Sequence, residues 1–156
     1  MYIKGFFVGL TFYFFAYAQE CLSLAQRYAE LEKSAIYEEL MIEADRLIKE
    51  ACSSNNEKLQ RSADKILSAL EVIRGNDFQL PKNKKLLDVV VQKRLRNALL
   101  MLNTTRKYKD KYTNLYSYQL LFYQVAKENA RVKDYEYALK YSQASYLIGR
   151  AILELR

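Results

Sequence analysis

The 156-residue sequence contains no histidine and no tryptophan, and it has one proline, four glycines and two cysteines. The absence of histidine removes the commonest general base, the commonest zinc ligand and every Ser–His or Cys–His nucleophile pair. Glycine-rich phosphate loops and C-x-x-C redox pairs are also missing. We therefore expect a non-enzymatic protein that uses no cofactor and no metal.

The scarcity of helix breakers restricts the fold. After residue 18 the only glycines are Gly75 and Gly149 and the only proline is Pro81, which leaves little room for hairpin turns. The rest of the sequence is rich in Ala, Leu, Glu, Lys and Arg, which favour helix over sheet. We predict an all-α fold of about five mostly antiparallel helices, arranged as a helical bundle or an array of helical hairpins.

The start of the chain has the three parts of a secretory signal peptide. Lys4 is the only charge before Glu20, an apolar stretch follows it, and an A-x-A triplet ends at Ala18. The stretch is shorter than the roughly 20 apolar residues that a membrane-spanning helix needs. We predict a signal peptide at residues 1–18 and a single exported helical domain at 19–156, with the bacterial periplasm as its compartment. An uncleaved anchor and a buried N-terminal helix are the alternatives.

Apolar residues at helical spacing predict the positions of the helices. They cover residues 20–52, a segment from Ser54 to Gly75, residues 83–108, residues 115–132, and a last helix that begins at Tyr135. Ser54 and Glu57 have the spacing of a capping box for the second helix, and Asp134 is a good N-cap for the last.

Two patterns predict how these helices pack. On the third helix, Leu86, Val89 and Leu100 form a second apolar strip beside Lys93 and Arg96, which favours a central helix with more than one neighbour. The last helix carries a row of small residues, which predicts tight packing against the fourth helix. The row consists of Ala138, Ser142, Ser145 and Gly149.

Residues 120–152 resemble a tetratricopeptide-like helical hairpin. The residues that carry the resemblance are Tyr123, Ala126, the turn Lys133-Asp134-Tyr135, then Tyr137-Ala138-Leu139, Tyr141 and Ala144. The resemblance implies the packing of a helix pair and a tendency to bind proteins. No second copy occurs at a period near 34, whereas a solenoid stacks several copies.

Cys21 and Cys52 are the only cysteines. At the two ends of one straight helix they would lie about 46 Å apart, at 1.5 Å per residue, too far for an intrachain bridge. Three arrangements stay open: free thiols, a disulfide between two chains, and a break in the first helix near Ser34 that lets them meet.

A block of basic residues occupies positions 82–111, where the net charge is +8. The basic residues are Lys82, Lys84, Lys85, Lys93, Arg94, Arg96, Arg106, Lys107, Lys109 and Lys111. Such a block suits an anionic membrane surface or another polyanion. We favour a simpler interpretation, in which a solvated helix face is balanced by the acidic first helix of the same domain.

Tyrosine is in excess, with nine of the 14 tyrosines from Tyr108 onward. Tyrosines are enriched at protein interfaces, although they also fill helical cores with their hydroxyls reaching water. We predict that Tyr112, Tyr116, Tyr135 and Tyr137 form a surface for a protein partner.

Taken together, these patterns predict an exported helical module that binds another protein in the cell envelope as a scaffold or adaptor. The alternative is a peripheral membrane or polyanion binder that acts through residues 82–111. Nucleic acid is not expected as a partner of an exported protein, and the sequence does not indicate an oligomeric state.

Overall fold

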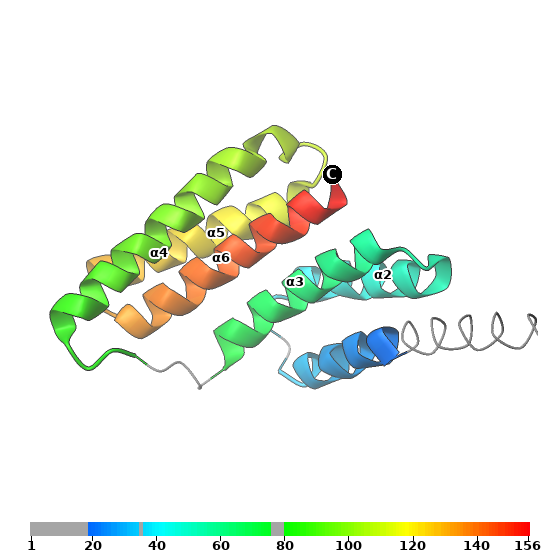
Figure 1. Cartoon of the computed structure of the whole chain (residues 1–156), viewed down its shortest axis with the longest axis horizontal. Helices are drawn as coiled ribbons and strands as arrows, with labels where there is room; N and C mark the ends of the chain where they lie inside the picture. Colours follow the sequence, from blue (N-terminus) through cyan, green and yellow to red (C-terminus); the bar gives the residue numbers. More distant parts are fainter. Residues whose placement is uncertain (1–18, 35, 76–79) are drawn as a thin grey trace, which may run out of the picture.

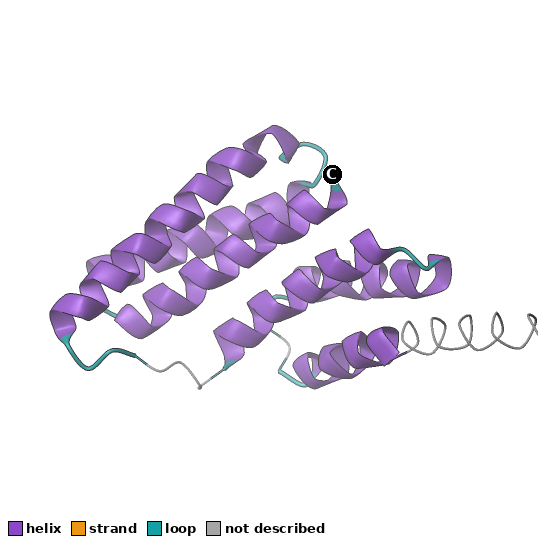
Figure 2. Cartoon of the chain, viewed as in Figure 1, coloured by secondary structure: helices purple, strands orange, loops and turns teal. Residues whose placement is uncertain are grey.

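The computed structural model describes residues 19–34, 36–75 and 80–156. Within these residues the chain forms six α-helices and a short 3-10 helix, without strands (Figures 1 and 2). They are a helix over 19–32, α2 (Glu38–Ser54), α3 (Glu57–Arg74), α4 (Lys84–Thr105), η1 (Arg106–Tyr108), α5 (Thr113–Arg131) and α6 (Tyr135–Leu155). The predicted all-α class is confirmed, with one helix more than expected. The predicted signal peptide, residues 1–18, lies outside the described residues.

The helices form two groups that lie against each other (Figure 1). The helix over 19–32 belongs with α2 and α3, whereas α4, α5 and α6 form the second group, and α3 packs along α6 to join them. One buried apolar cluster runs through both groups, from Leu24 through Ile66 to Phe122 and Ile152. The two groups therefore share a hydrophobic core.

The first described helix ends at residue 32 and α2 begins at Glu38, so the expectation of one helix over 20–52 is wrong. The backbone N–H and the hydroxyl of Ser34 both donate to the carbonyl oxygen of Leu31 and end the first helix, at 3.0 and 3.1 Å. Tyr37 precedes α2 with a left-handed backbone, at φ 57°. This conformation costs roughly 1–2 kcal/mol for a residue with a side chain, so other contacts must compensate for it.

The break folds the helix over 19–32 back along α2 and brings the two cysteines together. Cys21 and Cys52 form a disulfide with their Cα atoms 5.8 Å apart. Of the three arrangements, the structure therefore has the break that lets Cys21 and Cys52 form an intrachain bridge. It has neither free thiols nor a disulfide between two chains at these residues. The 46 Å separation assumed a straight helix, which does not form.

The beginning of α3 also differs from the prediction. Asn56 is its N-cap, and the side-chain oxygen of Asn56 accepts hydrogen bonds from the backbone N–H groups of Lys58 and Leu59. Ser54 instead belongs to α2, and its hydroxyl donates to the carbonyl oxygen of Glu50. Serine and asparagine are both good N-caps. However, α2 continues through Ser54 and ends at Asn55, which has a left-handed backbone, so Ser54 cannot be the N-cap of α3.

The row of small residues on α6 packs closely against its neighbours, as expected. The Ser145 hydroxyl donates to the backbone carbonyl of Gln119 on α5 at 2.8 Å. A Cβ atom added at Gly149 would lie 2.2 Å from Cγ of Met101 on α4 and 2.6 Å from Nε2 of Gln119. Gly149 therefore lets three helices meet at one point.

We expect Gly149→Ala to destabilise the protein. Alanine gains about 0.5–1 kcal/mol over glycine within a helix, but overpacking against Met101 and Gln119 costs about 1–3 kcal/mol. Urea unfolding should show the net loss. In a Met101→Ala background the same substitution should cost less, and equal costs in both backgrounds would contradict the steric explanation.

Candidate docking face on α4

The four tyrosines predicted to form a partner surface do not lie together. Tyr112 and Tyr116 lie near the beginning of α5, where the Tyr112 hydroxyl donates to the carbonyl oxygen of Leu155 at the end of α6. Tyr135 and Tyr137 lie at the opposite end of this antiparallel pair, in the first turn of α6. Only Tyr137 is exposed, and the others are half-buried against the core. The structure therefore does not bring the four rings together on one surface, and a protein partner at these tyrosines stays a prediction.

A different aromatic cluster joins the two helix groups. The Tyr37 ring packs edge-on against Phe122 and Tyr118, with centroid distances of 5.0 and 5.9 Å. The hydroxyls of Tyr37 and Tyr141 lie 2.7 Å apart, within hydrogen-bond distance. Burial of the Tyr37 phenol, together with this hydrogen bond, raises its pKa well above the ordinary value. These contacts hold Tyr37 neutral and compensate for its left-handed backbone, so the cluster has a structural role.

The basic block has no acidic partners in the described structure. None of its ten basic side chains forms an ion pair with any described residue. The acids of α2 and α3 that form ion pairs do so with arginines and lysines of their own helix or with Arg27. We expected the acidic first helix to balance the positive charge of this block. In the described residues, no ion pair joins the two. The reason is topological, because α4 packs on α5 and α6, away from α2.

The predicted polyanion surface divides between α4 and its two ends. Lys93 and Arg96 lie in the middle of α4, Lys84 and Lys85 form its first turn, and Lys82 precedes it. Arg106 and Lys107 lie in η1, directly after α4. Lysines at a helix N-terminus add to the positive end of the helix dipole. Basic side chains therefore lie before α4, in its first turn, in its middle and directly after its end.

The second apolar strip of α4 faces solvent. Leu86, Val89 and Leu100 are 53%, 60% and 65% exposed. The prediction that a second neighbour covers this strip is wrong, because both helices that pack on α4 contact its opposite side, through residues such as Leu87 and Val91. An exposed row of large apolar side chains marks an interaction surface more often than an isolated exposed leucine does.

Helical spacing places the apolar strip and two bases on one face. Positions 86, 89, 93, 96 and 100 recur at steps of three and four, so Lys93 and Arg96 stand between the apolar side chains. We call this set, Leu86, Val89, Lys93, Arg96 and Leu100, the outward face of α4. It carries no acid, since Asp88 points to the side of the helix.

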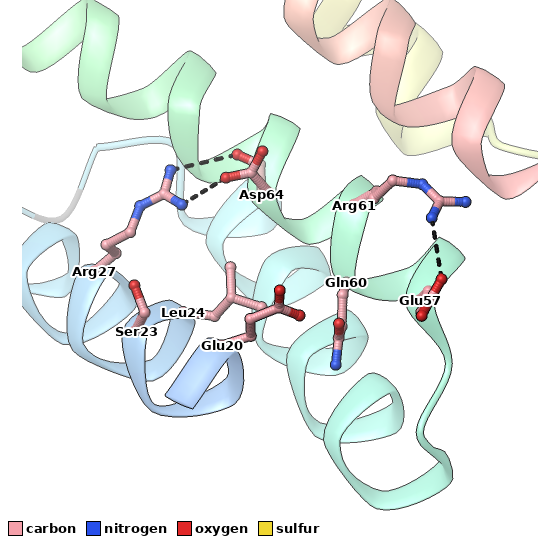
Figure 3. A pocket seen from close by; sticks show the side chains of 8 residues that line it. All are labelled: Glu20, Ser23, Leu24, Arg27, Glu57, Gln60, Arg61 and Asp64. Carbon is pink, nitrogen blue, oxygen red and sulfur yellow. Dashed lines mark hydrogen bonds and ion pairs between the residues drawn. The ribbon is translucent and has the colours of Figure 1, made fainter. Parts of the chain in front are cut away.

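A groove lies elsewhere, between the helix over 19–32 and α3 (Figure 3). It has a volume of about 470 Å³, and Arg27 reaches across it to Asp64 at 2.6 Å. Arg61 pairs with Glu57 and also with Glu154 on α6. Its arginines are thus engaged in joining helices, which indicates a structural role for these charges.

Two further observations limit the choice of site. In the parts of the chain that the structure describes, no three or more acidic or sulfur ligands gather as a metal ion would require. Across the same residues, no helix has both the length and the apolar character to cross a membrane.

Neither a family model, nor a curated protein, nor a solved structure matches the chain. The structure does place the antiparallel pair α5 and α6 where the tetratricopeptide resemblance predicts a helical hairpin. Such a pair occurs in many helical folds, so membership of that family stays a prediction. The outward face of α4 is therefore the candidate functional site.

Proposed function

We propose that the protein is an exported, non-enzymatic helical module that binds the anionic surface of a membrane through the outward face of α4. The observation that carries the proposal is the exposure of Leu86, Val89 and Leu100 beside Lys93 and Arg96, which have no acidic partner among the described residues. The predicted tyrosines lie at opposite ends of a helix pair. We therefore favour a membrane surface over a protein partner that binds through these tyrosines.

Amphipathic helices that lie in the plane of the membrane interface bind lipid in this way. Apolar side chains on such a helix enter the boundary between headgroups and acyl chains, while lysine and arginine extend their charged ends to the phosphates. Each basic residue near an anionic surface contributes about 1 kcal/mol. The basic residues at both ends of α4 extend the positive potential beyond the face and orient the helix along the surface.

Vesicle sedimentation tests the proposal. The purified chain should bind vesicles that contain phosphatidylglycerol more tightly than vesicles of phosphatidylcholine alone, and binding should weaken as salt rises. Lys93→Gln combined with Arg96→Gln should reduce the partition coefficient about thirtyfold, which corresponds to about 2 kcal/mol. Leu86→Ser, Val89→Ser and Leu100→Ser together should reduce it at least tenfold, because burial of each apolar side chain is lost.

A matched control removes two charges elsewhere. Lys58→Gln on α3 combined with Lys127→Gln on α5 changes the net charge by the same amount, at two exposed residues outside the outward face. This pair should bind vesicles almost as the wild type does. Equal losses in both pairs would mean that only net charge matters and would contradict the proposal. Binding to native membranes that disappears after protease treatment, without binding to lipid vesicles, would instead indicate an acidic protein partner and would overturn it.

A further inference from the structure

A small pocket lies between α4 and α6, beside the outward face. Arg94 and Asn97 line it from α4, whereas Ser142, Gln143 and Tyr146 line it from α6, and its volume is about 150 Å³. Side chains three or four positions apart lie on the same side of a helix. Each helix therefore supplies one wall of the pocket, and both walls carry polar groups.

Of the five polar side chains that line this pocket, only that of Ser142 has a hydrogen-bond partner among the residues that the structure describes. The Ser142 hydroxyl donates to the carbonyl oxygen of Leu139 at 3.0 Å. The side chains of Arg94, Asn97, Gln143 and Tyr146 make no hydrogen bond or ion pair with any residue that the structure describes. Four side chains able to donate hydrogen bonds thus surround one space, and no other described residue engages them.

The charge in the pocket has one sign. Arg94 is a permanent cation, and none of the residues that line the space is acidic. A guanidinium group binds phosphate and carboxylate groups through two parallel hydrogen bonds. The two side-chain amides and the phenol can each add one donor. The pocket is therefore suited to an anion.

We propose that the pocket between α4 and α6 binds a phosphate group. Donors reach the space from two helices, which suits the tetrahedral arrangement of phosphate oxygens better than the plane of a carboxylate. The volume of about 150 Å³ leaves room for a phosphate group whose ester substituent extends into solvent.

The phosphate group has two sources, a lipid headgroup and a small phosphate ester in solution. Asn97 lies one turn from Lys93 on α4, so this wall of the pocket adjoins the outward face. A headgroup phosphate could therefore enter the pocket while the face rests on a membrane. The phosphate site does not require the membrane proposal, however, because a soluble ester would use the same donors.

Nuclear magnetic resonance of the ¹⁵N-labelled chain tests the site. The side-chain amides of Asn97 and Gln143 should shift saturably when inorganic phosphate, glycerol 3-phosphate or monomeric short-chain phosphatidylglycerol is added. Arg94→Gln should weaken binding about tenfold or more, because it removes a charge-assisted pair of hydrogen bonds. Gln143→Leu, which keeps the charge, should weaken it about threefold or more.

The control is Lys127→Gln, which removes one exposed charge from α5, outside this pocket. It should change the affinity less than about twofold, since surface charges far from a site are screened. Tighter binding of the short-chain lipid than of glycerol 3-phosphate assigns the site to a headgroup, and the reverse order assigns it to a soluble ester.

Shifts that fail to saturate with all three probes would overturn the phosphate site, as would equal losses for Arg94→Gln and Lys127→Gln. These outcomes are independent of vesicle sedimentation. Loss of vesicle binding in the variants of Leu86, Val89 and Leu100 tests the outward face alone, because none of those residues lines the pocket.

Discussion

Replacing both cysteines, Cys21→Ser with Cys52→Ser, should lower the free energy of unfolding by about 3–4 kcal/mol. The disulfide closes a loop over a sequence separation of 31 residues, and the chain-entropy model gives about that stabilisation for a loop of this length. Much of the effect should fall on the helix over 19–32, which is the segment that the bridge holds against α2. Urea unfolding followed by circular dichroism measures the loss, and hydrogen exchange locates it.

Reductant provides the control for this prediction. It should lower the stability of the wild type by about the same amount and leave the double variant unchanged. Arg27 still pairs with Asp64 and Glu71 in the reduced state, so the helix over 19–32 should loosen without detaching fully. An unfolding midpoint that is equal in wild type and double variant would contradict the intrachain bridge. So would a covalent dimer that disappears on reduction.

Phe122→Ala should cost about 3–5 kcal/mol, the range observed when a buried aromatic side chain is truncated. Phe122 is fully buried, and its ring contacts those of Tyr37, Tyr118 and Tyr141. The substitution leaves a cavity where the two helix groups meet and also removes support from the left-handed backbone of Tyr37. Equilibrium unfolding in urea should show a large shift of the midpoint.

Two comparisons make this prediction specific. Tyr137→Ala removes an exposed ring at the edge of the same cluster and should cost less than about 1 kcal/mol. Tyr37→Ala should cost less in the Phe122→Ala background than in the wild type, by about 0.5–1.5 kcal/mol, since the two rings contact each other. Strict additivity of the two losses would show that Phe122 does not support Tyr37.

Much of the helical architecture was predictable because local signals determine it. The end of α3 at Gly75 and the start of α6 after Asp134 follow the usual preferences of helix ends, and the Asp134 side chain accepts a hydrogen bond from the N–H of Tyr137. The break between the helix over 19–32 and α2 was only one of three open arrangements. It contains no proline or glycine, and Tyr37 is held by rings more than 80 positions away.

Only part of the candidate site could be predicted from the sequence. Helical spacing showed that Leu86, Val89 and Leu100 share a side of α4 with Lys93 and Arg96. It did not show whether another helix covers that side, since burial depends on how the whole chain packs. The tyrosines illustrate the same limit, because composition alone does not separate rings in a core from rings at an interface.

The position of the disulfide has a consequence for the order of folding. Cys21 and Cys52 both lie in the first third of the chain and are its only cysteines. On the proposed export route, the segment that contains both would emerge from the translocation channel before α4, α5 and α6. Oxidation could then close the first helical hairpin while the rest of the chain is still threading. With no third thiol available, no incorrect intrachain pairing could form, and maturation would need an oxidant but no disulfide isomerase.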